Sequence, residues 1–361
     1  MWIDKGAKKM DAEQLYDVTI IGGGPAGLFA AFYSGLREMK TKIIEYQPNL
    51  GGKVHVYPEK LIWDIGGIPP ITGSKFIEQV VQQGLTFDPT VLLGEKVTSL
   101  DKNEANHFVI HTASGHTHYS KTVVLAIGSG ILTPTKLDIA GAERFEVSNL
   151  QYTVQSLARF KDKVVLISGG GNSAVDWANE LEPIAKKVYL IYRKDLLKGH
   201  EAEVSKLSDS SVDCLLNTSI QQLIAAKDKE TIEKVELINN ENGQTTLLSV
   251  DEVVINHGFK MDHHLIQNSP LQINMANEYG IEGTSMSETS IEGLYAVGDI
   301  LHHNGKLHLI AGAFQDAANA INKAKQYITP HANEQAMVSS HNERFKEKNR
   351  KLVRYLYKQA E

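Results

Sequence analysis

The stretch DVTIIGGGPAG, residues 17–27, decides the fold of this chain. Its apolar run ends in glycines and a helix-like pattern follows over residues 28–36, which predicts a strand, a tight turn and the start of a helix. Gly22 permits the turn, Gly24 lets a pyrophosphate approach the backbone, and Gly27 lets the helix pack on the strand. The free N–H groups at the helix start would then hold phosphate oxygens.

The next predicted strand, residues 41–45, ends in an acid, Glu45. An acid about 20 residues after the glycines is what a dinucleotide site uses to bind a ribose hydroxyl. The alternative is a glycine-rich turn that holds no ligand. The position of Glu45 favours the dinucleotide site.

The composition indicates a globular chain of two or three domains, with 361 residues of which 42% are hydrophobic. The net charge of -6 gives no reason to expect nucleic acid, and no apolar run reaches transmembrane length. Residues 1–14 are polar and lack the apolar core of a secretory signal. The one cysteine, Cys214, excludes an internal disulfide and any C-x-x-C dithiol, and it fits a cytoplasmic location.

A second nucleotide pattern occupies residues 163–181: a strand, the turn GGGNSA at 169–174, and a helix. The strand that follows, 187–192, ends without an acid, and Arg193, Lys194 and Lys198 come next. An acid there would bind a free ribose hydroxyl, whereas cations accept a 2′-phosphate, so the pattern favours NADP over NAD. The alternative is a solvated basic turn.

The chain as a whole is predicted to be of the α/β class. It would contain two Rossmann-like dinucleotide-binding domains, the second inserted into the first. Two apolar strands run into Gly128 and Gly258 and are interpreted as the crossings between domains. The first domain is predicted at 1–130 plus 259–361 and the second at 131–258. Further strands are expected at 62–65, 97–100, 108–111, 116–119, 122–128, 212–216, 232–238, 245–248, 252–258 and before Asp299, and helices at 73–83, 310–327 and in the basic tail 341–361, with Phe345, Leu352 and Leu356 on one side.

On these motifs the chain resembles the flavoprotein reductases with two dinucleotide-binding domains that are related to bacterial thioredoxin reductase. The matching stretches are the two glycine turns, residues 126–128, and Gly298-Asp299. Within that superfamily it is similar to the thioredoxin-reductase-like ferredoxin–NADP(+) reductases, through residues 57–60, 173–178, 181–186 and a C-terminal extension, 331–361. The resemblance implies FAD in the first domain, NADPH in the second, a homodimer, and ferredoxin or flavodoxin as the electron acceptor.

The resemblance also implies roles for single residues. Glu45 would bind the adenosine ribose, Tyr57 would stack on one flavin face, and Asp299 would bind the ribityl and pyrophosphate region. The full set expected on FAD is Gly22, Gly24, Gly27, Glu45, Gly52, Lys53, Tyr57, Val97, Leu132, Asp299, Ile310, Val338 and Ser340. The set expected on NADPH is Gly169, Gly171, Asn172, Ser173, Arg193 and Lys194.

This chain departs from the family pattern at three places. Lys53 stands where glutamine is usual, and lysines partly replace the arginines at the 2′-phosphate, which keeps the charge but loses the bidentate fork. Val338 aligns with a histidine that stacks on the second flavin face, so an aliphatic side chain, contributed by the partner subunit, is expected there; His341 would take that place only if the alignment shifts.

No catalytic acid, base or metal site is expected, because the flavin carries the chemistry; the helix that begins near Ile310 would stabilise negative charge on it through its dipole. Two alternatives to a ferredoxin or flavodoxin reductase stay open. One is a low-molecular-weight disulfide reductase using Cys214, which lacks a resolving thiol. The other is a non-catalytic flavin-binding redox sensor, which would bind FAD with little NADPH turnover.

Overall fold

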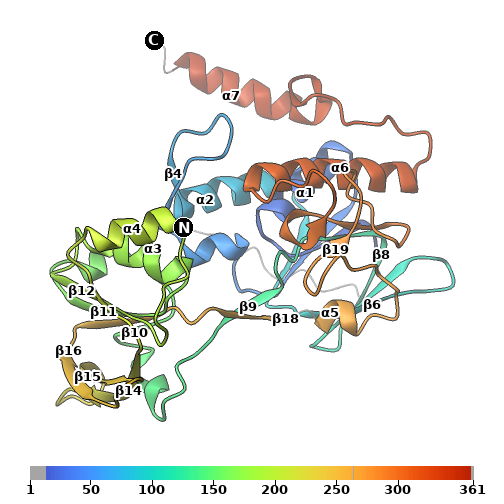
Figure 1. Cartoon of the computed structure of the whole chain (residues 1–361). Helices are drawn as coiled ribbons and strands as arrows, with labels where there is room; N and C mark the ends of the chain where they lie inside the picture. The colour runs from blue at the N-terminus through green and yellow to red at the C-terminus, as the bar shows by residue number, and fades with distance from the viewer. Residues whose placement is uncertain (1–13, 263, 359–361) are drawn as a thin grey trace. The chain divides into compact units, whose positions relative to one another are not determined.

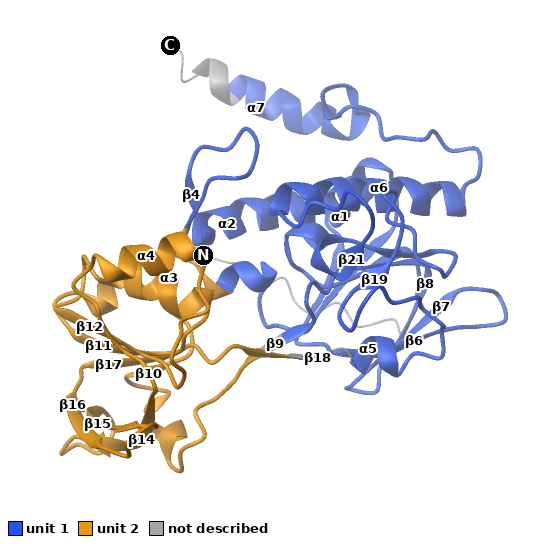
Figure 2. Ribbon diagram, viewed as in Figure 1, with its two compact units in different colours: residues 1–55, 61–131, 262–361 blue, residues 56–60, 132–261 orange. Residues whose placement is uncertain are grey.

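The structure is a computed structural model that describes residues 14–262 and 264–358. It divides into two compact units (Figure 2). Unit 1 contains Met1–His55, Leu61–Ile131 and Asp262–Glu361, and unit 2 contains Val56–Lys60 and Leu132–Met261. The inserted segment of unit 2 begins one residue after the predicted second domain, 131–258, and ends three residues beyond it. The short segment Val56–Lys60 differs from the prediction, because it packs with unit 2.

Unit 1 is built on a sheet that has seven strands among the described residues (Figure 1). Strands β5, β2, β1, β8 and β20 are parallel, and the hairpin β6–β7 pairs antiparallel with β8. The strands are β1 (Leu15–Ile21), β2 (Thr41–Glu45), β5 (Thr90–Leu93), β6 (Val97–Lys102), β7 (Phe108–Thr112), β8 (Thr117–Leu125) and β20 (Leu294–Ala296).

Strand β8 corrects one prediction. The sequence suggested two strands, 116–119 in a small meander and 122–128 in the main sheet. The structure has a single strand whose first half pairs with β7 and whose last residues pair with β20. Ser120 and Thr122, at and beside the gap between the two predicted strands, are buried and their hydroxyls donate to backbone oxygens, which removes the cost of burying them.

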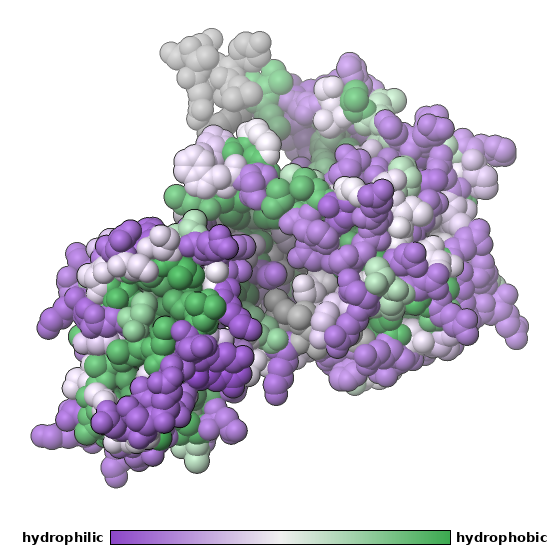
Figure 3. All heavy atoms as spheres, in the orientation of Figure 1, coloured by the Kyte–Doolittle hydropathy of each residue, from purple (hydrophilic) through white to green (hydrophobic). Residues whose placement is uncertain are grey.

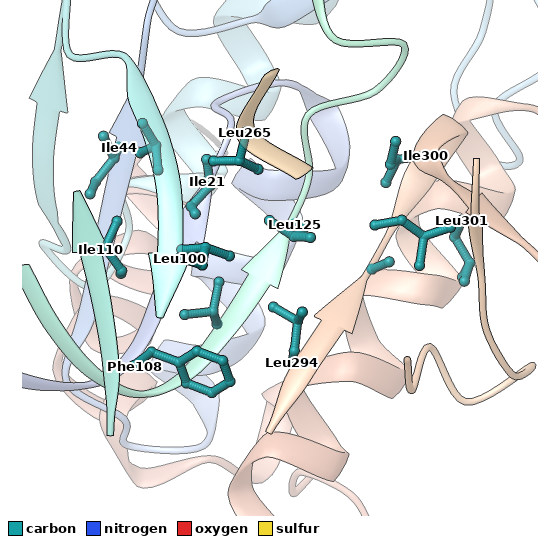
Figure 4. Packing of buried hydrophobic residues seen from close by; sticks show 14 residues of the cluster. Ile21, Ile44, Leu100, Phe108, Ile110, Leu125, Leu265, Leu294, Ile300 and Leu301 are labelled. Atoms are coloured by element: carbon teal, nitrogen blue, oxygen red, sulfur yellow. The ribbon is translucent and has the colours of Figure 1, made fainter. Parts of the chain in front are cut away.

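The core of unit 1 lies where β6, β7, β8 and β20 face the segments that follow β18 and β20 (Figure 4). Phe108, Leu125 and Leu294 are almost fully buried there. Helix α1 (Pro25–Leu36) packs against α2 (Gly73–Gly84) and α6 (Ile310–Ile328). The other elements of unit 1 are η1 (Gly52–Val56), β3 (Leu61–Ile62), β4 (Ile71–Thr72), α5 (His264–Gln267), β19 (Ile281–Glu282), η4 (Gly298–Ile300), β21 (Leu301–His302), η5 (Ser339–His341), η6 (Glu343–Phe345) and α7 (Lys346–Lys358).

Residues 342–345 attach the C-terminal segment to the C-terminal end of α1. Asn342 Nδ2 donates to Leu36 O at 3.4 Å, and Arg344 Nη1 donates to Gly35 O at 3.2 Å. These carbonyls belong to the last turn of α1, where Gly35 O also accepts the Glu38 N–H at 3.1 Å, so the C-terminal segment adds two donors at the helix end. The Phe345 ring lies 5.2 Å from that of Phe87. Phe345 lies in η6, which ends before α7 begins, whereas Leu352 lies on α7 and is 58% exposed. These two residues therefore do not share the predicted face of one helix. The side chain of Leu356 lies outside the described part.

Unit 2 has three layers. A parallel sheet carries helices on one face and an antiparallel sheet on the other, and apolar side chains fill both interfaces. The parallel sheet has the order β10 (Leu150–Gln151), β17 (Glu252–Ile255), β11 (Val164–Ser168), β12 (Lys187–Ile191), β13 (Asp213–Leu215). The helices are α3 (Asn172–Leu181) and α4 (Glu201–Ser208), with η2 (Ala142–Phe145) and η3 (Leu157–Phe160). The antiparallel sheet is β14 (Thr218–Ala225), β15 (Ile232–Asn239) and β16 (Thr245–Ser249); β14 was not predicted.

Two crossing strands, β9 (Ile131–Pro134) and β18 (Phe259–Asp262), pair with each other. Thr135 N donates to Gly258 O at 2.9 Å, so the two ends of the inserted segment lie side by side. Gly128 and Gly258 both have positive φ angles, 58° and 89°. Figure 3 shows hydrophilic side chains over much of the visible face of each unit, as is usual for a folded chain with 22% charged residues.

Candidate cofactor-binding sites

The first glycine turn, between β1 and α1, requires glycine at two positions for internal reasons. Gly22 has φ +105°, and a Cβ on it would lie 2.4 Å from Ala126 O. A Cβ on Gly27 would lie 2.0 Å from Gly22 O. A side chain on Gly22 would clash with the backbone after β8, and one on Gly27 would push α1 away from the turn.

Gly24 is different, because no contact within the described part of the chain requires it to be glycine. Its backbone is extended, with φ -75° and ψ -176°, and a Cβ would meet no atom closer than Gly52 Cα at 3.7 Å. Gly171, at the start of α3, has nearly the same geometry, with φ -92° and ψ -178°, and a Cβ there would meet nothing within 4 Å. Each is the N-cap residue of a helix that begins after a glycine turn, and each leaves open the space that a bound phosphate would fill.

Glu45 fixes the first turn from the end of β2. It is buried at 7% exposure, and its Oε2 accepts the Gly23 N–H at 2.6 Å while Oε1 accepts the Gln47 N–H at 2.7 Å. Two backbone donors therefore hold the carboxylate beside the turn. Sequence reasoning gave Glu45 only the role of a ribose ligand.

The other residues expected on FAD are spread over unit 1. Val97 is buried in β6, whereas Lys53 in η1 and Asp299 in η4 are exposed. Gly52 has φ +61° and packs against Gly24, because a Cβ on it would lie 2.7 Å from Gly24 Cα. Ile310 is the first residue of α6.

Two of the expected FAD residues belong to unit 2. Tyr57 packs against the core formed by α3 and the parallel sheet. Its neighbour Lys60 forms ion pairs with Asp176 and Glu180 on α3, both at 3.2 Å. Leu132 lies in β9, and its side chain is outside the described part of the structure.

In the second turn, between β11 and α3, each of the three glycines has different surroundings. Gly169 has φ +154°, and a Cβ on it would lie 2.5 Å from Asn256 O. Gly170, which the sequence analysis did not single out, lies under the Tyr192 ring, so that a Cβ would come within 2.3 Å of it. Gly171 alone is free of such contacts.

A cavity of about 670 Å³ lies at this turn, within unit 2. Arg193 lines it, but Lys194 does not; the Lys194 carbonyl instead accepts the Asn217 N–H at 3.0 Å. Ser173 lines it, and so does Asn172, whose Oδ1 accepts the His200 N–H at 2.9 Å. The wall is formed by residues 135–139, Tyr152, 168–174, 191–193, 218–220 and 255–259.

His257, just after β17, was missed by sequence reasoning. Its Nε2 lies 2.9 Å from Ser168 Oγ, and it shares the cavity wall with Arg193. Burial, and then the charge of Arg193, lower the pKa of His257. A neutral imidazole is the form favoured here. The available signal was its position at the carboxyl end of a strand beside the glycine turn, where α/β sheets bind their ligands.

The C-terminal residues expected on the second flavin face are exposed in this chain. Val338 is 63% exposed and precedes η5, and Ser340 Oγ lies 3.3 Å from His341 Nδ1. In the described ranges, 14–262 and 264–358, no group of three or more His, Cys, Asp or Glu side chains could hold a metal ion. Within the same ranges no helix has the length and apolarity needed to cross a membrane.

Two glycine turns of the same design, one in each α/β unit, define an oxidoreductase with two dinucleotide-binding domains, and this fold class was predicted from the sequence. The model of the pyridine nucleotide-disulphide oxidoreductase family matches residues 16–324, and the chain belongs to that family. "Ferredoxin--NADP reductase 1" of Bacillus mycoides is 64% identical over 349 residues, 97% of this chain and all of that protein. "Ferredoxin--NADP reductase 2" of Exiguobacterium sibiricum is 61% identical, over 97% of this chain and 99% of that one.

A solved structure agrees with the fold. The thioredoxin reductase of T. acidophilum superposes with a TM-score of 0.69, at 24% identity, over 87% of this chain and 99% of its own. The resemblance predicted from the motifs is therefore confirmed by the family match and the curated relatives, and the solved structure confirms the fold.

Proposed function

We propose that this enzyme transfers electrons from NADPH, by way of FAD, to ferredoxin, with flavodoxin as a second acceptor of the same kind. It is an oxidoreductase that uses FAD and NADP(H). The observation that carries the proposal is the pair Gly24 and Gly171. A side chain at either position would meet no close contact in the fold, so a bound ligand is the reason for glycine there. The near-complete coverage of relatives called ferredoxin–NADP reductases supports the choice of acceptor.

The residues of unit 1 fit FAD. Gly24 leaves room for a pyrophosphate at the N-terminus of α1, and its helix N–H groups favour negative charge there. Glu45 sits beside the turn at the position of a ribose ligand. When bound, FAD supplies both hydride acceptance and one-electron transfer, which is why the chain needs no acid–base residue of its own.

The residues of unit 2 fit NADPH. Gly171 and Ser173 present the start of α3 to the cavity, and Arg193 brings a permanent positive charge to its wall. An arginine fork matches a phosphate group, so Arg193 selects a dinucleotide with a 2′-phosphate. Lys194 adds charge from outside the cavity wall.

Cys214 supports one-electron chemistry over disulfide reduction. It is the one cysteine of the chain, it is exposed in β13, and partial desolvation followed by the charge of Asp213 raises its thiol pKa. A thiol with a raised pKa forms little thiolate, and no second cysteine exists to resolve a mixed disulfide.

A cytoplasmic homodimer completes the proposal. Val338 is exposed here and would cover the second flavin face of the partner subunit. Light scattering after size-exclusion chromatography measures the oligomeric state, and a monomer at micromolar concentration contradicts the dimer.

The deciding experiment uses the purified holoprotein. Heat-released cofactor is identified by chromatography as FAD or FMN, and steady-state rates are measured with NADPH or NADH against ferredoxin, flavodoxin, and thioredoxin with a disulfide. We expect FAD, a preference for NADPH, and turnover with ferredoxin or flavodoxin only. Turnover of disulfides contradicts the proposal, and FAD binding without NADPH turnover identifies a redox sensor instead.

A further inference from the structure

Asp316 and Lys306 form an ion pair inside unit 1. Asp316 lies on α6, and Lys306 lies in the segment between β21 and α6. Their side chains are only 7% and 4% exposed, and Lys306 Nζ donates to Asp316 Oδ2. A buried ion pair contributes little to stability compared with apolar side chains of the same size, so its presence calls for another reason.

The same carboxylate oxygen accepts a backbone hydrogen bond. Gly298 N–H donates to Asp316 Oδ2 at 3.0 Å, and Gly298 has φ +73°. Ser287 Oγ donates to the Asp316 carbonyl at 3.0 Å, which ties this turn of α6 to the segment before β20. Asp316 is therefore held at two points while it fixes one backbone N–H.

Gly298 lies beside two parts of the proposed FAD site, the first turn of α1 and Asp299. A Cβ on it would lie 3.2 Å from the Cβ of Ala26, in the first turn of α1. The next residue is Asp299, which is exposed although both of its neighbours are buried. The orientation of the Gly298 peptide thus determines where the Asp299 carboxylate is presented next to the first glycine turn.

We propose that Asp316 is a positioning residue for FAD, which acts through Gly298 on Asp299. The inference rests on the proposed function, since it presumes that unit 1 binds FAD. Asp316 supplies the acceptor that holds the Gly298 N–H. Lys306 cancels the negative charge that this acceptor would otherwise place near the pyrophosphate of the cofactor.

The test separates the hydrogen bond from the ion pair. Asp316→Asn/Lys306→Met removes both charges and keeps a side-chain oxygen for Gly298, whereas Asp316→Leu/Lys306→Met removes the charges and the acceptor. Apoprotein is titrated with FAD, and the dissociation constant is read from quenching of flavin fluorescence. We expect the Asn variant to bind FAD within about threefold of the wild type, and the Leu variant to bind at least about tenfold more weakly, because a buried N–H is left unpaired.

A double-mutant cycle with Asp299→Asn tests whether Asp316 acts through Asp299. If Asp316 acts through Asp299, the loss of FAD affinity caused by Asp299→Asn is smaller in the Leu variant than in the wild type. Ser287→Ala, a milder change, should weaken FAD binding about two- to fivefold and serves if the Leu variant does not fold. Lys75→Met/Glu78→Gln is the control, because this pair on α2 of unit 1 is 2.6 Å apart and exposed; it should leave FAD affinity unchanged.

Equal affinities in the Asn and Leu variants, or an unchanged affinity in Ser287→Ala when the Leu variant is unfolded, overturn the inference. A wild-type protein that binds no FAD would instead overturn the proposed function. The two failures are therefore distinguishable in the same titration.

Discussion

The ammonium group of Lys42 lies 3.2 Å from His118 Nδ1 inside unit 1, and both side chains are buried. Lys42 Nζ also lies 4.1 Å from the centre of the Tyr16 ring. Nδ1 must be the acceptor of this contact, because lysine can only donate, so the neutral imidazole carries its proton on Nε2. That Nε2 has no hydrogen-bond partner among residues 14–262 and 264–358.

This pair predicts a loss of stability in acid. Burial, and then the charge of Lys42, lower the pKa of His118 to about 4, from a reference of 6.5. Between these values the unfolded chain binds a proton that the folded chain does not, so stability falls as the pH drops from 6.5 to 4. His118→Asn keeps an acceptor for Lys42 without titrating, and should reduce the acid loss by roughly 1–3 kcal/mol at pH 4.

Urea midpoints measured at several pH values between 4 and 8 check this. His331→Asn, at an exposed histidine, is the control and should follow the wild-type curve. A curve for His118→Asn that is parallel to the wild type throughout means that His118 is already protonated in the folded state. Lys42, whose pKa burial lowers to about 8 from 10.5, gives a second rise of stability between pH 8 and 10.5 by the same reasoning.

Adjacent glycines of the second turn should respond differently to alanine. Gly170→Ala places a methyl group 2.3 Å from the Tyr192 ring, so it should lower the melting temperature by several degrees, corresponding to about 1–3 kcal/mol. Gly171→Ala meets no protein atom within 4 Å and should leave the melting temperature of the NADPH-free protein almost unchanged, yet raise the KM for NADPH. Thermal unfolding and steady-state kinetics of both variants separate the two effects. Equal KM values for Gly171→Ala and wild type remove Gly171 from the phosphate site.

The two cations after β12 should contribute unequally to cofactor choice. Arg193 lines the cavity and Lys194 does not, so Arg193→Ala should raise the KM for NADPH about five- to a hundredfold, in line with 1–3 kcal/mol for a charged hydrogen bond. Lys194→Ala should change it less than threefold, since only a screened charge is lost. The KM for NADH is the internal control and should stay nearly constant in both variants. A similar loss with NADH would show that Arg193 contacts a part common to both dinucleotides.

The cap on α1 should contribute measurably to stability. Arg344→Ala removes the donor to Gly35 O and the guanidinium that lies 4.8 Å from the Phe87 ring centre, and should cost about 1 kcal/mol, or about 2 °C in melting temperature. Lys346→Ala, which breaks only an exposed pair with Glu343, is the matched control and should have almost no effect. Differential scanning calorimetry measures both. Identical melting temperatures would mean that the C-terminal segment does not stabilise α1.

The two glycine turns were predictable because their demands are local. Gly27 is required by a contact between the turn and the helix that follows it, and Gly22 by its positive φ and by the backbone of Ala126 after the neighbouring strand, and both contacts recur wherever this turn is built. The parallel strands were predictable for a similar reason, because strands buried on both faces are continuous apolar runs.

The features that were missed depend on distant partners. Residues 56–60 were assigned to the first domain, but they pack with unit 2, through Lys60 and the acids of α3 that lie more than a hundred residues away; the flavin contact of Tyr57 stays a prediction. Strand β14 follows β13 after a short turn at Asn217, and its mixed polar and apolar residues gave no clear period. Asp316 looked like an ordinary helix residue, because nothing local reveals that it accepts the Gly298 N–H.

The junction between Thr135 and Gly258 has a consequence for protein engineering. Because the two backbone positions are joined by a hydrogen bond of 2.9 Å, the segment between them leaves and re-enters at almost the same point. Excising it would require only a linker of a few residues, and a homologous module with equally close ends could be grafted in its place. If unit 1 binds FAD and unit 2 binds NADPH, as proposed, chimeras made at this junction would exchange the specificity for the reductant while keeping the flavin-binding unit, provided that residues 56–60 are exchanged with the graft.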